Sequence, residues 1–174
     1  MTTKLVISAL GADRPGIVDE LSRFIYKNQL NIEDSRMTVL GGEFAVLLLI
    51  SGDDTCINSF QEKLADIEQS LDMRLLIKTT SASENNSNAM PYSVEVSALD
   101  QPGIVGNIAN FFSSRKFNIV DLQTERYAAP HTGSPMFALT MTIGIPADTN
   151  IAKLRDEFVQ TCDDLNLDAE LNSL

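Results

Sequence analysis

The chain has 174 residues, of which 44% are hydrophobic, and it carries a formal net charge of −11. No apolar stretch approaches the roughly 20 residues that a membrane-spanning helix needs, so we expect no membrane span. The two halves are both acidic, with net charges of −5 for residues 1–87 and −6 for residues 88–174. Direct binding to a nucleic-acid backbone depends on clustered Lys and Arg, so we expect no direct nucleic-acid contact.

The cysteines and the histidine offer no metal or redox site. Cys56 and Cys162 lie outside any CxxC motif, and we expect them to be buried or half-buried thiols. His131, the single histidine, stands among turn residues and is expected to be exposed. No cofactor or metal is therefore expected. The amino terminus shows no signal-peptide pattern, so we expect a cytoplasmic location.

Residues 1–80 predict one small domain. Leu, Val and Ile over 4–10 indicate a strand, and apolar residues at helical spacing over 16–28 indicate a helix. The remaining predicted elements are strands at 32–40 and 43–51 joined by a Gly41-Gly42 turn, a helix that starts at 52–55, and a strand at 73–78. The order βαββαβ is the ferredoxin-like α+β plan, with four antiparallel strands and two helices on one face.

Residues 81–90 form a polar tract without apolar periodicity, which predicts a linker. Residues 91–174 then predict a second domain of the same order. Its expected elements are strands at 92–98, 119–127, 136–143 and 167–171 and helices at 103–115 and 149–164. A longer hairpin loop at 128–135 is the main difference from the first half.

A short motif occurs twice, as Asp13-Arg14-Pro15-Gly16-Ile17-Val18 and as Asp100-Gln101-Pro102-Gly103-Ile104-Val105. The spacing of 87 also relates Asn31-Ile32 to Asn118-Ile119. This repeat favours two domains of roughly 80 residues rather than one. Domains this small bury modest cores, so pairing with each other or with a second chain is expected.

Each motif follows a predicted strand and opens a predicted helix, so its turn is a candidate binding site. Proline is expected at the first helical position, and the following glycine allows close approach to the backbone. Asp13 and Asp100 are expected near the helix N-cap. The free N–H groups there can receive a small carboxylate. A tightly turned, capped helix without a ligand is the alternative interpretation.

The D-x-P-G-I-V motif followed by Asn-Ile at the start of the next strand resembles the ACT domain, a small regulatory module that commonly binds amino acids. The resemblance covers nearly all of both halves. It implies an effector site between the turn and the start of the second strand, often shared across an interface between two ACT domains. The ligand-binding residues that it implies are Asp13, Pro15, Gly16, Ile17 and Asn31, with Asp100, Pro102, Gly103, Ile104 and Asn118 in the second copy. Asn31 and Asn118 could also be left-handed residues that end a helix, and the two interpretations are compatible.

The first copy is similar to tandem ACT members that repress transcription. The resemblance implies a non-enzymatic regulator that senses a small amino acid, glycine first among them. It further implies repression of glycine cleavage genes through contact with a transcriptional activator protein, with a homodimer as the expected assembly. A regulatory or scaffold subunit of a metabolic enzyme is the alternative.

Two further classes fit the sequence less well. An enzyme is disfavoured because the repeat occupies both halves and leaves no nucleophile–base pair, metal spacing or phosphate loop. An RNA-binding domain shares this strand order but uses sheet aromatics beside basic residues. The first predicted strands here provide one aromatic residue, Tyr92, and the chain is acidic.

Overall fold

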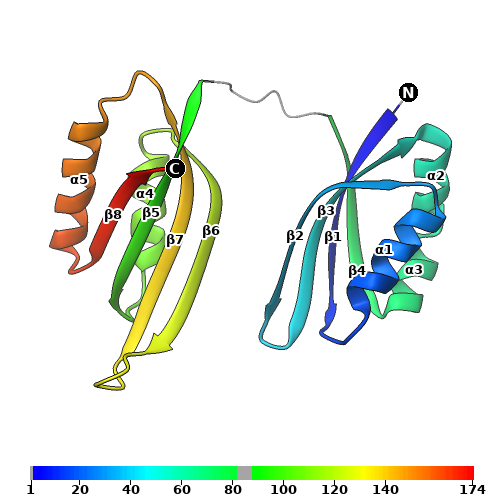
Figure 1. The fold of residues 1–174 in the computed structure, drawn as a ribbon, viewed down its shortest axis with the longest axis horizontal. Coiled ribbons are helices and arrows are strands. Elements are labelled where there is room, and N and C mark those ends of the chain that lie inside the picture. The colour runs from blue at the N-terminus through cyan, green and yellow to red at the C-terminus, as the bar shows by residue number, and fades with distance from the viewer. Residues whose placement is uncertain (1, 82–87) are drawn as a thin grey trace. The chain divides into compact units, whose positions relative to one another are not determined.

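The computed structural model describes residues 2–81 and 88–174. The chain divides into two compact units, Met1–Glu84 and Asn85–Leu174 (Figure 1). The first unit contains β1 (Thr2–Ala12), α1 (Ile17–Lys27), β2 (Asn31–Leu40), β3 (Glu43–Asp53), α2 (Asp54–Glu62), α3 (Leu64–Leu71) and β4 (Met73–Thr80). Its sheet has the order β2-β3-β1-β4, and every neighbouring pair is antiparallel.

The second unit repeats this plan. It contains β5 (Ala89–Leu99), α4 (Ile104–Ser113), β6 (Asn118–Ala128), β7 (Pro135–Pro146), α5 (Ile151–Asp164) and β8 (Asp168–Ser173), in the sheet order β6-β7-β5-β8. The prediction of two ferredoxin-like α+β domains in tandem is therefore confirmed. None of the helices among these described residues has the length and apolar character needed to span a membrane.

Each core lies between the sheet and the helices that cover one of its faces (Figure 1). Alternate residues of β1, namely Leu5, Ile7 and Ala9, point into the first core and are at most 1% exposed. The helix stripe that meets them includes Leu21 and Ile25. The second core contains three mutually packed rings, Phe111, Phe112 and Phe158. One face of each sheet is thus buried and the other is left open.

The second predicted helix of the first unit is two helices. Lys63 separates α2 from α3 with φ −90° and ψ 5°. Its N–H donates to the Phe60 carbonyl, three residues back, at 3.2 Å. The apolar spacing alone did not reveal this break, because Ile57, Phe60, Leu64 and Ile67 all still reach the same core.

The region between the units differs in one respect from the expectation. β5 begins at Ala89, two residues before the expected start of the second domain, because Ala89 and Met90 pair with Pro146 and Ile145 of β7. Residues 82–87 of the expected linker lie outside the described residues.

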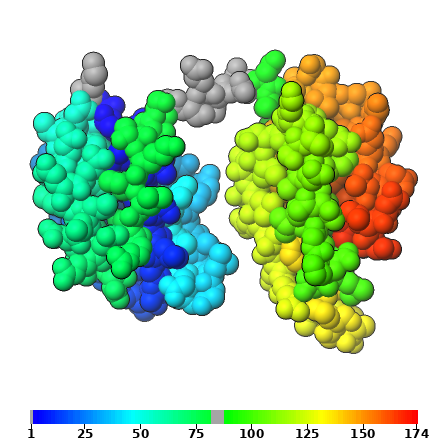
Figure 2. Space-filling model, turned by 180° about the vertical axis from the view of Figure 1, so that it is seen from behind, coloured from blue at the N-terminus to red at the C-terminus, as the bar shows by residue number. Residues whose placement is uncertain are grey.

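The long loop of the second unit, residues 129–134, projects from the end of β6 and β7 (Figures 1 and 2). The Ala129 N–H donates to the Ser134 carbonyl and the Gly133 N–H donates to the Ala129 carbonyl, both at 2.9 Å. His131 in this loop is exposed, as predicted. The insertion therefore closes on itself by main-chain bonds.

The two thiols differ in burial, and this difference predicts different reactivity. Cys162 is 1% exposed, and burial, assisted by the charge of Asp163, raises its pKa from 9.0 to about 11. Cys56 is half-buried. We expect a disulfide reagent at pH 8 to modify Cys56 and spare Cys162 in the native chain, since the thiolate is the reactive form.

Labelling at increasing pH checks this expectation. The Cys56→Ser variant should be silent at pH 8 and should gain reactivity as the pH approaches 11. It should react fully in denaturant at pH 8. Fast labelling of native Cys56→Ser at pH 8 would contradict the burial of Cys162.

Candidate functional site

The repeated motif folds as a type II turn that leads directly into a helix. In the first unit the Ile17 N–H donates to the Arg14 carbonyl at 3.4 Å, with Pro15 and Gly16 at the central positions. Gly16 has φ 89° and ψ −7°, close to the left-handed conformation that the third residue of this turn requires. Gly103 repeats this conformation, with φ 97° and ψ −8°. Proline sets the first central dihedral of the turn and glycine allows the second.

This turn corrects two expectations about the motif. Pro15 and Pro102 precede the helices and do not occupy their first positions, because α1 and α4 begin one residue after the glycine. Asp13 and Asp100 do not cap the helices either, since Gly16 and Gly103 are the N-cap residues and neither helix has a side-chain cap bond.

The aspartates instead continue the sheet. The Asp13 N–H donates to the Gly42 carbonyl at 3.0 Å, and the Asp100 N–H donates to the Pro135 carbonyl at 2.9 Å. Each aspartate therefore extends the pairing of its strand with the neighbouring hairpin. The turn follows this bond, and each helix begins four residues after the aspartate.

The turn presents main-chain amides at the start of a helix. Ile17 and Ile104 are each 3% exposed and anchor the turn in the core, and the Ile17 N–H already donates to the Arg14 carbonyl. Gly16 and Gly103 are exposed. Amides at a helix start, together with the positive end of the helix dipole, favour a small anion such as a carboxylate.

A side chain between the aspartate and the proline ties each turn to the end of the second helical segment. An Arg14 Nη2 group lies 3.5 Å from the Leu71 carbonyl oxygen, and the Gln101 Nε2 group donates to the Leu165 carbonyl at 3.3 Å. Leu71 ends α3 and Leu165 follows α5, so the two contacts are equivalent. They hold the turn in place from the side opposite the sheet hairpin.

The turn of the first unit contains an internal ion pair. Arg14 donates to both carboxylate oxygens of Glu20, at 2.8 and 2.6 Å. This hydrogen bonding raises the pKa of Arg14 and lowers the pKa of Glu20. The Glu20 Oε1 atom lies only 3.8 Å from the point where a Cβ on Gly16 would stand. A carboxylate of the protein itself therefore already lies beside the glycine of this turn.

The turn of the second unit contains neutral side chains at the same places. Gln101 replaces the arginine, and Asn107 replaces the glutamate with its Nδ2 atom 3.8 Å from the Cβ point of Gly103. Asp100 is engaged elsewhere, in an ion pair with Arg126 Nε at 2.7 Å. The second turn thus offers an amide donor where the first offers a carboxylate.

Neither asparagine reaches the turn of its own unit. Asn31 pairs with Ser51, near the end of β3, whereas Asp13 is bonded at Gly42, just before β3 begins. Asn118 pairs with Gly144, at the end of β7 remote from Asp100. At about 3.3 Å per residue, each asparagine lies roughly 25–30 Å from its turn. The predicted ligand set is therefore split between the two ends of each sheet.

The asparagines are also not the left-handed residues that end the helices. Those residues are Gln29, with φ 59°, and Lys116, with φ 61°, each two positions earlier. Asn31 and Asn118 begin strands β2 and β6 and are exposed. Asn31 lines an open hollow of about 760 Å³ with Gln29.

A sequence profile of the ACT domain matches residues 3–78. The glycine cleavage system transcriptional repressor of Escherichia coli (strain K12) is 31% identical over 168 residues, which cover 97% of this chain and 88% of that protein. The chain belongs to the family of this repressor.

Two solved structures extend the similarity to the whole ACT pair. One, whose assignment as a glycine cleavage system transcriptional repressor is itself provisional, has a TM-score of 0.76 and 29% identity and covers 100% of this chain and 98% of its own. The other is a protein of unknown function from Galdieria sulphuraria, with a TM-score of 0.82, 26% identity and coverage of 100% and 99%. The tandem ACT architecture is therefore common to this chain and both structures.

Sequence reasoning missed the side chains around each ACT turn. The spacing of 87 aligns Arg14 with Gln101 and Glu20 with Asn107. Comparing these aligned positions would have shown that the first turn has charged side chains where the second has neutral ones. The pairing of Asp100 with Arg126 depends on the β5–β7–β6 register and had no signal in the sequence.

The left-handed glycine of the second ACT unit can be tested against a glycine in the same helix. We expect Gly103→Ala to destabilise the unit by about 1–2 kcal/mol, the cost of positive φ for a residue with a Cβ. A Cβ there meets no atom closer than 3.8 Å, so strain in φ is the cause. The matched control is Gly106→Ala, inside α4 with open space around it, which should stabilise by about 1 kcal/mol. Urea unfolding followed by circular dichroism measures both, and equal effects would contradict the turn assignment.

Proposed function

We propose that this protein is a non-enzymatic regulator that senses a small amino acid, with glycine the first candidate, and represses transcription through contact with an activator protein. The observation that carries the proposal is 31% identity to a glycine cleavage system transcriptional repressor along 97% of the chain. The matched ACT domain supports the regulatory role. Expression of glycine cleavage genes is the natural output for such a sensor.

The duplicated turn supports a small zwitterionic effector. Its main-chain amides suit a carboxylate, and the exposed glycine beside them lets a ligand approach closely. The candidate residues in one copy are Asp13, Pro15, Gly16 and Ile17, although Ile17 is buried and its N–H also serves the turn itself. Their counterparts are Asp100, Pro102, Gly103 and Ile104.

Within this proposal the second unit is the better receptor. An effector carboxylate at the first turn must compete with Glu20, which is held beside Gly16 by two bonds from Arg14. At the second turn Asn107 can donate its amide to the same carboxylate. Like charges repel at short range, so the neutral turn favours an anion over the turn that already carries one.

Asn31 and Asn118 belong to this proposal only as contributions from another ACT unit. Each lies a strand length from its own turn, so a second copy of the chain in a homodimer would have to supply it. An effector site shared between two ACT domains is compatible with this geometry when one domain supplies the turn and the other supplies the asparagine.

Contact with a protein, rather than with DNA, is the proposed route to repression. A net charge of −11 opposes binding to phosphate backbones. A cytoplasmic location follows from this role. A regulatory or scaffold subunit of a metabolic enzyme is the alternative, and it would be favoured if the chain co-purified with an enzyme and not with a transcription factor.

Calorimetry with glycine, serine, alanine and the other common amino acids tests the sensor proposal. We expect one of them, glycine first, to bind and to stabilise the chain. At tenfold excess over the dissociation constant the stabilisation is about 1.4 kcal/mol, which corresponds to a rise in Tm of roughly 5 °C or more for a domain of this size. No heat and no thermal shift with any amino acid at millimolar concentration would remove the sensing function.

A pair of isosteric changes tests which turn binds. Asn107→Asp places a carboxylate beside the α4 amides and should weaken glycine binding by about tenfold or more, since two like charges then share the site. Asn110→Asp makes the same chemical change near the end of α4 and is the matched control. Glu20→Gln replaces the competing carboxylate of the first turn with a neutral amide, so it should not weaken glycine binding. Loss of binding in both asparagine variants would point to helix damage instead of a specific site.

A further inference from the structure

The open sheet faces of the two units differ in chemistry although their backbones match. Antiparallel partners point to the same side of a sheet, so the strand registers define each face row by row. In the first unit one row across β3, β1 and β4 is Leu47, Ser8 and Leu76. The equivalent row across β7, β5 and β8 is Thr140, Glu95 and Glu170. An apolar row in one unit thus corresponds to an acidic row in the other.

The open face of the first unit combines exposed leucines with basic side chains. Leu10, Leu47 and Leu76 are 50%, 51% and 74% exposed. Arg74 lies opposite Leu10 on β4, and Lys78 lies two rows away on the same strand. We call the surface formed by these five residues the apolar–basic face. Large apolar side chains clustered on a sheet commonly mark an interaction site.

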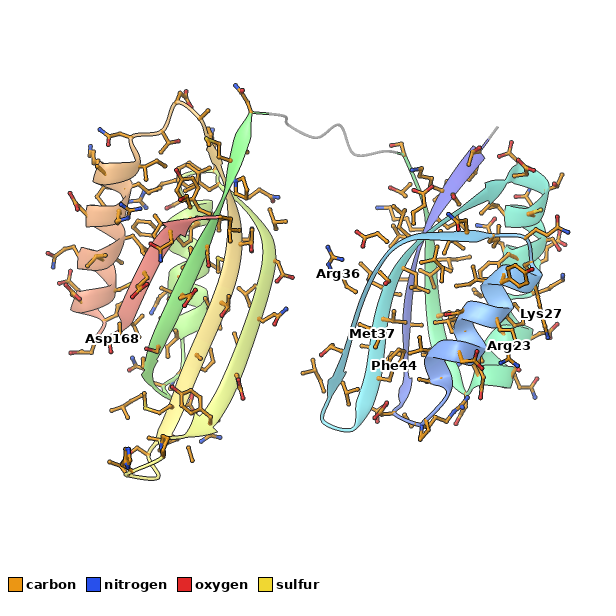
Figure 3. The ribbon with its side chains drawn as sticks, viewed as in Figure 1. Arg23, Lys27, Arg36, Met37, Phe44 and Asp168 are labelled. Carbon is orange, nitrogen blue, oxygen red and sulfur yellow. The ribbon has the colours of Figure 1, made fainter. Side chains whose placement is uncertain are left out.

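Two details indicate that the apolar–basic face receives a partner. Among the described residues Arg74 and Lys78 form no ion pair, in contrast to Arg36, which pairs with Asp34 at 2.8 Å. A small apolar hollow of about 80 Å³ lies between Val6, Leu47 and Leu49 beside that pair. Figure 3 shows Arg36 on β2, on the side of the sheet away from the helices.

The open face of the second unit is acidic. Glu95 and Glu170 stand directly opposite each other, an arrangement in which like charges repel. Asp168 occupies the position equivalent to Arg74, and Asp121 and Glu125 follow along β6. We call the surface formed by these five residues the acidic face. Glu95, Asp168 and Glu170 line a hollow of about 430 Å³, and the two rows of the sheet that hold them contain no basic residue.

From this complementarity we infer that the apolar–basic face of one copy docks on the acidic face of the second unit in another copy of the chain. Pairing either face with itself would gather like charges, whereas pairing the two unlike faces places Arg74 and Lys78 against carboxylates. Exposed Leu99 and Tyr127, at one end of the second unit's open face, can cover part of the leucine surface.

Two copies joined in this way form a closed dimer. Each chain carries one apolar–basic face and one acidic face, so a two-fold axis satisfies both faces of both chains at once. No third molecule is then needed to cover the leucines. The repulsion between Glu95 and Glu170 is relieved in the same step by the basic side chains of the other copy.

A charge exchange between two variants of the full chain tests the inference. The first variant, Arg74→Glu/Lys78→Glu, makes both open faces acidic, and the second, Glu95→Lys/Glu170→Lys, replaces the paired carboxylates at the centre of the acidic face with lysines. We expect the wild type to sediment as a dimer in low salt and each variant to weaken dimerisation by about 100-fold or more, because each interface occurs twice. An equimolar mixture of the two variants should restore the dimer, since every face then meets its opposite.

The matched control is Arg23→Glu/Lys27→Glu, the same charge change on exposed positions of α1 (Figure 3). This variant should remain dimeric, and circular dichroism should show all variants folded. A monomeric wild type at 100 µM would overturn the inference. So would dimers that survive both exchanges, or loss of the dimer in the first variant alone, which would indicate pairing of leucine faces.

The mixture also separates pairing between chains from pairing within one chain. If the wild type is monomeric, and a chain carrying all four exchanges recovers the stability that each variant loses, the two faces meet inside one molecule and the dimer is refuted. The inference does not depend on the effector. Glycine binding can fail while the dimer persists, and the dimer can fail while calorimetry still reports binding.

Discussion

The left-handed glycine between the first strand and the first helix of each unit is the constraint on which the site depends. The aspartate before it is fixed to the sheet by its N–H, and the isoleucine after it is fixed in the core. The chain must change from a strand to a helix within the few residues between these two points. A type II turn does so only when its third residue can adopt positive φ, and Gly16 and Gly103 supply that freedom. The exposed amides result from this turn.

The same backbone then supports two different surfaces. Both units keep the turn, the buried isoleucine and the bond from the turn to the end of the second helical segment. They differ where side chains face solvent, in the neutral or charged groups beside the turn and in the open sheet faces. In a strand, solvent-facing residues alternate with core residues. A solvent-facing residue can therefore change without disturbing the core, so the two copies of a duplicated fold can take different functions.

Periodicity and the repeat predicted the fold, because both are local signals repeated along the chain. The run rich in Leu, Val and Ile over residues 4–10 and the Gly41-Gly42 turn were sufficient to predict strands of the sheet. The site was less predictable, since spacing in sequence does not reveal which end of a sheet a residue occupies. Asp13 and Asn31 are separated by one helix that returns along the sheet, so they lie at opposite ends. The break between α2 and α3 at Lys63 was not predicted, because the apolar residues on both sides of it still face the same core.

The net charge of −11 does not describe how the charges are distributed over the surface. The first unit is acidic in sum, yet its open face places Arg74 and Lys78 beside exposed leucines. A phosphate backbone would use the basic groups but leave the leucines in water, because it offers no apolar surface. A protein surface with carboxylates and apolar side chains can satisfy both. The arrangement of these residues, more than their number, therefore favours a protein partner over nucleic acid.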